Sequence, residues 1–128
     1  MKVAAVDHIT INCKDTETSF RFYEQVLGLK RLETVDMGDH VLYYYGLPGV
    51  RLELIGYKEP QKEQETGNTD VGIYRHMALA VDDLEEVYQR CQKWGSKINL
   101  TPSYIAQIKK KIVLIVDPNG VEIEIIQA

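Results

Sequence analysis

Residues 75–83, RHMALAVDD, repeat the pattern of residues 7–15, DHITINCKD. His76 follows His8 at a distance of 68 residues, and an aspartate follows each histidine seven positions later. Both stretches alternate side-chain character with a period of two, which is typical of a half-buried β-strand. The larger apolar residues share one strand face, and the histidine lies on the other. The sequence therefore predicts a duplicated unit whose histidines point away from the helix-covered faces, into the space that two sheets enclose.

The first half of the chain predicts the element order βαβββ. A strand over residues 3–12 is followed by a helix that Asp15 can cap, that carries apolar residues at helical spacing and that ends at Gly28. Turn-forming residues then separate three shorter strands. These strands are expected over residues 30–35, 40–45 and 51–55.

The second half predicts the same order. Asp83 and Glu86 form a capping-box pair at the start of a helix with one apolar stripe, and Gly95 ends this helix. The strands are expected over residues 74–81, 97–100, 109–116 and 121–127. The predicted fold class is α+β, with two paired βαβββ modules that form a half-barrel-like cup. The single domain, residues 1–128, is expected to consist of module one (1–56), a polar linker (57–73) and module two (74–128).

Composition limits the classes of function. With 128 residues, 45% hydrophobic and 27% charged, the chain is expected to be one soluble domain. A net charge of −4 argues against nucleic acid as a partner, and the only basic run, residues 109–111, is short. Neither a membrane span nor a signal peptide is recognisable, so we expect a cytoplasmic protein. Cys13 and Cys91 form no C-x-x-C motif and are interpreted as buried thiols.

The last strand of each half carries a glutamate at an equivalent position. Residues 51–55, RLELI, contain Glu53, and residues 122–126, EIEII, contain Glu124. Large aliphatic residues flank each glutamate and fill the helix-covered face, so the carboxylates face the same side as the histidines. Two imidazoles and two carboxylates from strand interiors make a mixed nitrogen and oxygen ligand set for a divalent metal ion. The candidate metal ligands are His8, Glu53, His76 and Glu124.

Two further polar residues receive a different interpretation. Glu122 shares a strand face with Glu124 but lies nearer the turn and overlays Arg51, so we interpret it as a solvated or ion-paired residue at the rim. His40 has no counterpart in the repeat and is interpreted as a surface or pocket-rim residue.

The duplicated pattern resembles the vicinal oxygen chelate superfamily, which comprises glyoxalases, bleomycin-resistance proteins and extradiol dioxygenases. The resemblance covers essentially the whole chain and implies metal ligands on the first and last strands of each module, which are the same four residues. Their order, His, Glu, His, Glu, is most similar to that of compact bacterial lactoylglutathione lyases. The stretches that carry the resemblance are residues 7–11 (DHITI), 20–29 (FRFYEQVLGL), 75–83 (RHMALAVDD) and 117–124 (DPNGVEIE).

The resemblance implies a metal-dependent isomerase or lyase that acts on a small carbonyl compound with two adjacent oxygens. The divalent ion (Ni, Co, Zn, Mn or Fe) would stabilise an enediolate as a Lewis acid, and Glu53 or Glu124 would move the proton as general base. It also implies a homodimer, with the site formed within one chain or between two chains.

Two other classes of protein remain as alternatives. An extradiol-type dioxygenase would use two histidines and one carboxylate. A non-catalytic binding protein of the bleomycin-resistance kind would hold a planar ligand against aromatic side chains, for which Tyr43, Tyr45 and Tyr57 are candidates.

Two positions differ from the glutathione-binding members of the resembled family. Bacterial glyoxalases usually carry an arginine four residues after the first histidine and an asparagine four residues after the first-module glutamate. Asn12 and Tyr57 occupy these positions here. We therefore expect weak or absent turnover of the methylglyoxal–glutathione hemithioacetal.

Overall fold

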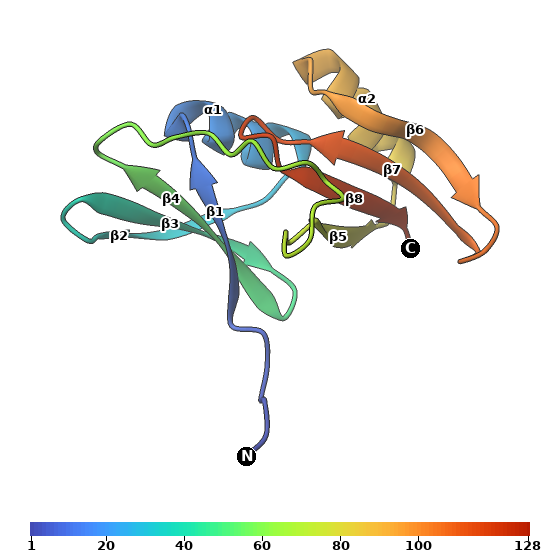
Figure 1. The fold of residues 1–128 in the computed structure, drawn as a ribbon. Coiled ribbons are helices and arrows are strands. Elements are labelled where there is room, and N and C mark those ends of the chain that lie inside the picture. The colour runs from blue at the N-terminus through green and yellow to red at the C-terminus, as the bar shows by residue number, and fades with distance from the viewer. The chain divides into compact units, whose positions relative to one another are not determined.

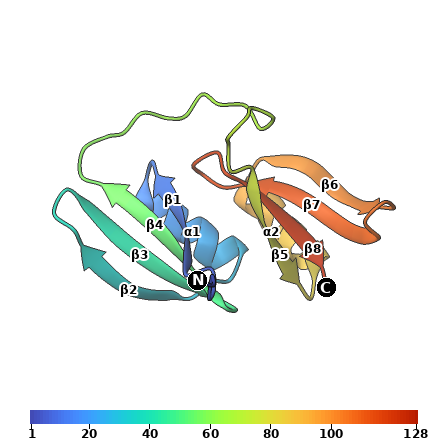
Figure 2. The same ribbon diagram turned by 60° about the horizontal axis from the view of Figure 1, so that its bottom comes forward.

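The computed structural model describes residues 1–128 and divides into two compact units, Met1–Lys62 and Glu63–Ala128. Each unit consists of a four-stranded mixed sheet with a helical segment against one face (Figures 1 and 2). The predicted α+β class with two βαβββ modules is confirmed. No helix in the structure has the length and apolar character needed to cross a membrane.

Unit 1 places its first and last strands side by side. Its sheet has the order β1-β4-β3-β2, in which β1 and β4 are parallel and the other neighbours are antiparallel. A parallel pair needs a crossover connection, which the helical segment after β1 begins. The elements of unit 1 are β1 (His8–Cys13), α1 (Thr16–Arg21), the π-helical segment η1 (Phe22–Val26), β2 (Arg31–Asp36), β3 (His40–Leu47) and β4 (Val50–Tyr57).

Unit 2 repeats this arrangement with the order β5-β8-β7-β6 and a parallel β5–β8 pair. The predicted helix start is confirmed, because the side chain of Asp83 accepts a hydrogen bond of 3.0 Å from the Glu86 backbone N–H. Gly95 ends the helix in the left-handed conformation, with φ 85°. The elements are β5 (His76–Val81), α2 (Leu84–Trp94), β6 (Ile98–Ile105), β7 (Lys110–Val116) and β8 (Glu122–Gln127).

The helix-covered face of each sheet forms the core of its unit. Leu52 and Leu54 of β4, and Ile123 and Ile125 of β8, have no exposed surface. The glutamate between each of these pairs must therefore point to the opposite face, because successive strand residues alternate. The sequence-based assignment of the two strand faces is correct.

Strand register confirms that the two units are internal repeats. In each, the histidine of the first strand lies opposite the residue two positions before the glutamate of the last strand. The paired residues are His8 with Arg51 and Thr10 with Glu53 in unit 1, and His76 with Glu122 and Ala78 with Glu124 in unit 2.

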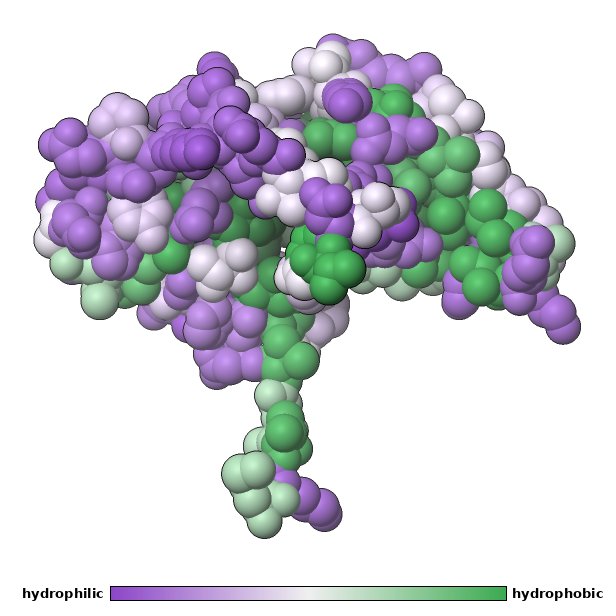
Figure 3. Space-filling view, in the orientation of Figure 1, coloured by the Kyte–Doolittle hydropathy of each residue, from purple (hydrophilic) through white to green (hydrophobic).

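The predicted strand over residues 3–12 is wrong at its beginning. β1 starts at His8, and residues 1–7 have no regular structure and extend away from the sheet of unit 1 (Figure 1). The apolar side chains of residues 1–7, including Val3 and Val6, are exposed, as the green surface of this segment in Figure 3 shows. The physical reason is the lack of a partner: β4 begins at Val50, and the Arg51 N–H reaches the carbonyl of Asp7.

The first predicted helix is also less regular than its sequence pattern suggests. α1 ends at Arg21, and η1 continues it with π-helical hydrogen bonding to Val26. Phe22, Tyr23 and Val26 are all buried in the core of unit 1. Asp15 occupies the N-cap position, where it accepts a hydrogen bond from the Thr18 hydroxyl.

Both cysteines carry free thiols. Cys91 is fully buried, and burial raises the pKa of its thiol to about 11. Cys13 is partly buried. The interpretation as a buried thiol is therefore confirmed for Cys91 and is correct only in part for Cys13.

Candidate functional site

Unit 1 brings together the first predicted pair. His8 Nε2 lies 3.9 Å from Glu53 Oε2. Glu53 is 6% exposed, and its Oε1 accepts a hydrogen bond of 3.1 Å from the Thr10 hydroxyl. A hydrogen bond between Tyr44 and Glu53, together with desolvation, raises the pKa of Tyr44, so this phenol remains a donor. Thr10 and Tyr44 lie directly opposite Glu53 on the two neighbouring strands, so two hydroxyl groups hold one buried carboxylate.

The second ring nitrogen of His8, Nδ1, also contacts a carboxylate. Nδ1 lies 2.8 Å from Oδ2 of Asp7, and this hydrogen bond is the main reason that the pKa of His8 is raised. Asp7 is 94% exposed, so water competes for the interaction. Arg51, opposite His8, stacks its guanidinium 3.9 Å from the ring centre of Tyr44 and forms an ion pair with Glu33.

Unit 2 brings together the second predicted pair at shorter range. His76 Nε2 lies 3.0 Å from Oε2 of Glu124. On the other side of the ring, Nδ1 lies 3.1 Å from Oε1 of Glu122. The imidazole is therefore placed between two carboxylates, one at each nitrogen.

Glu122 is the residue that the sequence interpretation describes least well. It is ion-paired, as expected, with Arg75 Nε at 3.3 Å from Oε1, but it is 3% exposed and not solvated. Its Oε2 accepts hydrogen bonds from Asn99 at 2.9 Å and Asn68 at 3.2 Å. Burial alone would raise its pKa, but the bonds from Asn99 and His76 and the charge of Arg75 outweigh burial and lower the pKa.

The two repeat-related glutamates have different neighbours. Glu53 lies between Thr10 and Tyr44, whereas Glu124 lies between Ala78 and Leu114. Neither of the latter side chains can donate a hydrogen bond. Glu53 is thus oriented by strand hydroxyls, whereas Glu124 forms an ion pair with His76.

The sequence-based choice of tyrosines for ligand binding needs correction. Tyr45 is fully buried, and Tyr43 stacks edge-on against Phe20 of α1, with ring centres 4.7 Å apart. Both therefore belong to the helix-covered face. Tyr44 is the tyrosine of β3 on the face of His8, and a run of three tyrosines conceals this alternation in the sequence. Tyr57 is exposed and stacks on His40, with ring centres 5.3 Å apart.

The spacing of the pair in unit 2 fits two ligands of a divalent ion. With metal–ligand bonds of about 2.1 Å, adjacent ligands of an octahedral ion lie about 3.0 Å apart and opposite ligands about 4.2 Å apart. The separation of 3.0 Å in unit 2 matches adjacent ligands, and 3.9 Å in unit 1 lies between the two limits. No three His, Cys, Asp or Glu side chains form a group that could hold a metal ion. The structure therefore presents the four predicted ligands as two pairs, one in each unit.

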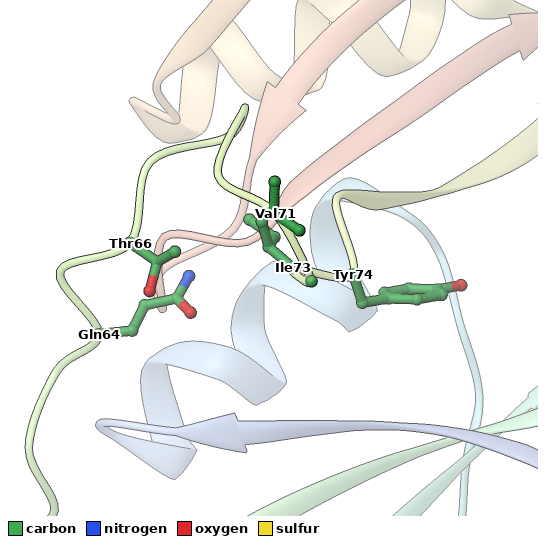
Figure 4. A pocket seen from close by; sticks show the side chains of 6 residues that line it. Gln64, Thr66, Val71, Ile73 and Tyr74 are labelled. Carbon is green, nitrogen blue, oxygen red and sulfur yellow. The ribbon is translucent and has the colours of Figure 1, made fainter.

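An open pocket of about 490 Å³ in unit 2 does not coincide with either pair. It is formed by residues 64–74, the segment that precedes β5, and contains none of the four predicted ligands. Figure 4 shows the ring of Tyr74 extending away from the other labelled side chains. We assign the candidate site to the two pairs because they contain the ligand-type groups and the pocket does not.

Comparison with known proteins places the chain in a family. Residues 5–125 match the model of the Glyoxalase/Bleomycin resistance protein/Dioxygenase superfamily. The protein belongs to this superfamily. The sequence-based resemblance is thereby confirmed.

Within the superfamily, the chain is 28% identical to a lactoylglutathione lyase of Salmonella typhimurium, covering 94% of this chain and 90% of that protein. It is also 28% identical to glyoxalase I of Saccharomyces cerevisiae, covering 94% of this chain but 42% of the yeast protein. The chain thus spans less than half of the yeast relative.

Solved structures of the superfamily show the same fold. A glyoxylase/bleomycin resistance protein/dioxygenase domain from Frankia sp. EAN1pec superimposes with a TM-score of 0.82 at 18% identity, and 99% of each chain is covered. Glyoxalase I from Zea mays superimposes with a TM-score of 0.80 at 21% identity, covering 97% of this chain and 44% of the maize chain.

Proposed function

We propose that this protein is a metal-dependent isomerase or lyase of the glyoxalase type, which acts on a small carbonyl compound with two adjacent oxygens. The observation that carries the proposal is the repeated pair of an imidazole Nε2 and a buried or half-buried glutamate. Superfamily membership and the 28% identity to the Salmonella typhimurium lactoylglutathione lyase support it.

In this proposal, one divalent ion (Ni, Co, Zn, Mn or Fe) is held by two histidines and two glutamates. When bound, the ion would polarise the two oxygens of the substrate as a Lewis acid. The pairs would complete the site either within one chain or between the two chains of a homodimer. The proposed ligands are His8, Glu53, His76 and Glu124.

The reaction needs one group that moves a proton, and the two glutamates are the candidates. A carboxylate would take the proton from a carbon that bears one oxygen and return it to the neighbouring carbon, so that no oxidant is consumed. Thr10 and Tyr44 would keep Glu53 in place during this transfer. The catalytic residues in the proposal are Glu53 and Glu124.

Metal analysis tests the proposal directly. Protein purified without chelator should carry close to one divalent transition metal ion per site, and added nickel, cobalt, manganese or zinc should raise the melting temperature of metal-depleted protein. His76→Ala should abolish this shift. His40→Ala is the matched control, because His40 contacts Asp39 and Tyr57 and belongs to neither pair.

The opposite result would favour a different class of protein. If elemental analysis finds no metal and none of the four ions changes the melting temperature, the chain is better described as a non-catalytic binding protein. In that case the face of Tyr44 and Arg51, and not the buried Tyr45, is where ligand contacts should be sought.

A further inference from the structure

We propose that Glu122 is a positioning residue that orients His76 for metal binding through Nε2. This inference rests on the proposed metal-dependent function, which it deepens. It starts from the distances at the two ring nitrogens, which are 3.1 Å from Nδ1 to Glu122 and 3.0 Å from Nε2 to Glu124.

Metal binding by a histidine depends on where its proton lies. A neutral imidazole that binds a metal through Nε2 carries its hydrogen on Nδ1, and this N–H group needs an acceptor. In unit 2 the acceptor is Oε1 of Glu122. The bond leaves the Nε2 lone pair on the side of Glu124, where the second ligand lies.

Glu122 is itself held in place from three directions. Asn99 of β6 and Asn68 donate to Oε2, and Arg75 donates to Oε1. The side chain is 3% exposed, so water does not compete strongly for the oxygen that faces His76. An acceptor fixed in this way restricts rotation of the imidazole more than a mobile one.

The other half of the chain provides an internal comparison. His8 also has a carboxylate at Nδ1, but this is Asp7, which is 94% exposed. The repeat-related counterpart of Glu122 is Arg51, which forms an ion pair with Glu33. In both units a carboxylate lies at Nδ1 of the histidine and a glutamate lies on the side of Nε2, but the carboxylate at Nδ1 comes from different positions of the repeat. The buried version should have the larger effect on metal affinity.

The experiment measures zinc binding to metal-depleted protein by calorimetry. Glu122→Gln should weaken zinc binding by about 10–100-fold, the usual effect of removing a partner behind a metal-binding histidine. Asn68→Ala is the matched control: it removes a donor to Oε2 and leaves Oε1 facing His76, so affinity should stay within about threefold of the parent protein. Asp7→Asn should have a smaller effect than Glu122→Gln, because Asp7 is exposed.

A spectroscopic measurement separates positioning from a merely structural role. In cobalt-loaded protein, the ring N–H of each bound histidine gives a paramagnetically shifted, exchangeable proton signal. The parent protein should show one signal that exchanges slowly with solvent, from His76, and this signal should exchange faster in Glu122→Gln. If Glu122→Gln does not fold, Glu122→Asp keeps the charge near Arg75 but withdraws the carboxylate from Nδ1, and the same weakening is expected.

Three results would contradict the inference. A folded Glu122→Gln or Glu122→Asp protein that binds zinc as tightly as the parent would show that Glu122 serves only the stability of unit 2. Rapid solvent exchange of both ring N–H signals in the parent protein would lead to the same conclusion without any variant. A parent protein that binds no metal would overturn the proposed function together with this inference.

Discussion

Gly56 is the position in unit 1 where one added methyl group should have a large and specific effect. It lies in β4 opposite Cys13 of β1, close to the point where α1 begins. A Cβ atom at this position would lie 2.5 Å from Cγ2 of Thr16, the first residue of α1, and 3.4 Å from the ring of Tyr43. Because ordinary contacts begin at about 3.4 Å, Gly56→Ala leaves the new methyl group roughly 0.9 Å too close to Thr16.

The expected magnitude follows from two opposing effects. Overpacking of this kind costs about 1–3 kcal/mol. Replacing a strand glycine by alanine restricts the unfolded chain and returns about 0.5–1 kcal/mol. The net loss for Gly56→Ala is therefore about 0–2.5 kcal/mol in the free energy of unfolding, with mid-range values giving about 1.2 kcal/mol. At roughly 4 °C per kcal/mol, the mid-range loss should lower Tm by about 5 °C.

Gly46→Ala is the matched control, because its Cβ would meet Leu32 at an ordinary distance of 3.8 Å. This variant should be as stable as the parent protein or slightly more stable. Thr16→Ser removes Cγ2, so the double variant with Gly56→Ala should recover most of the loss. Urea unfolding followed by circular dichroism measures all four variants, and the double-mutant cycle gives the coupling between the two positions. Additive losses, or a Gly56→Ala protein as stable as Gly46→Ala, would refute the packing argument.

Four further outcomes are expected. Glu53→Gln should keep most of the metal affinity but lower kcat by about 100-fold or more, as removal of a general base does; oxygen consumption with a catechol and iron at the parental rate would instead support the dioxygenase alternative. Turnover of the methylglyoxal–glutathione hemithioacetal should be weak, and a kcat/KM of about 10⁶ M⁻¹s⁻¹ or more would refute the argument from Asn12 and Tyr57. Leu54→Ala, at a fully buried position, should lower the free energy of unfolding by about 2–5 kcal/mol, measured in urea against the exposed-site control Leu32→Ala. In a Cys13→Ser background, Cys91 should resist alkylation at pH 8 until the protein unfolds, because burial raises its pKa to about 11; rapid labelling of the native protein would contradict its burial.

The repeat, the strand faces and the two His–Glu pairs could be predicted from the sequence for one physical reason. Strands alternate their side chains with a fixed period of two, so Ile and Leu neighbours reveal which way Glu53 and Glu124 point. Helix ends are equally local, which is why Asp83 and Gly95 were sufficient to delimit α2. Features that depend on adjacent residues are readable without the fold.

Features that depend on distant partners were not predictable. No sequence neighbour of Glu122 explains its burial, because its hydrogen-bond donors come from distant parts of the chain. These donors are Asn68, Arg75 and Asn99. The first residue of β1 is set by the start of β4, which lies about 40 residues away and could not be located to the residue. The role of Tyr44 was hidden because its neighbours Tyr43 and Tyr45 have the same side chain and the opposite face.

The side-chain contacts of Glu53 and Glu124 favour different roles for these two glutamates in one reaction. Glu53 accepts hydrogen bonds from Thr10 and Tyr44, and such bonds stabilise a carboxylate in one orientation. Glu124 has Ala78 and Leu114 at the same two positions, so no hydroxyl group holds its carboxylate, and its contact is the ion pair of Oε2 with His76. A base that must be aimed at one substrate carbon benefits from the first environment, whereas a carboxylate that must turn toward a metal ion benefits from the second. The two halves have kept the same backbone register while the side chains around the glutamates have diverged. In the proposed enzyme, this divergence provides a physical basis for unequal roles at two positions that the sequence alone presents as equivalent.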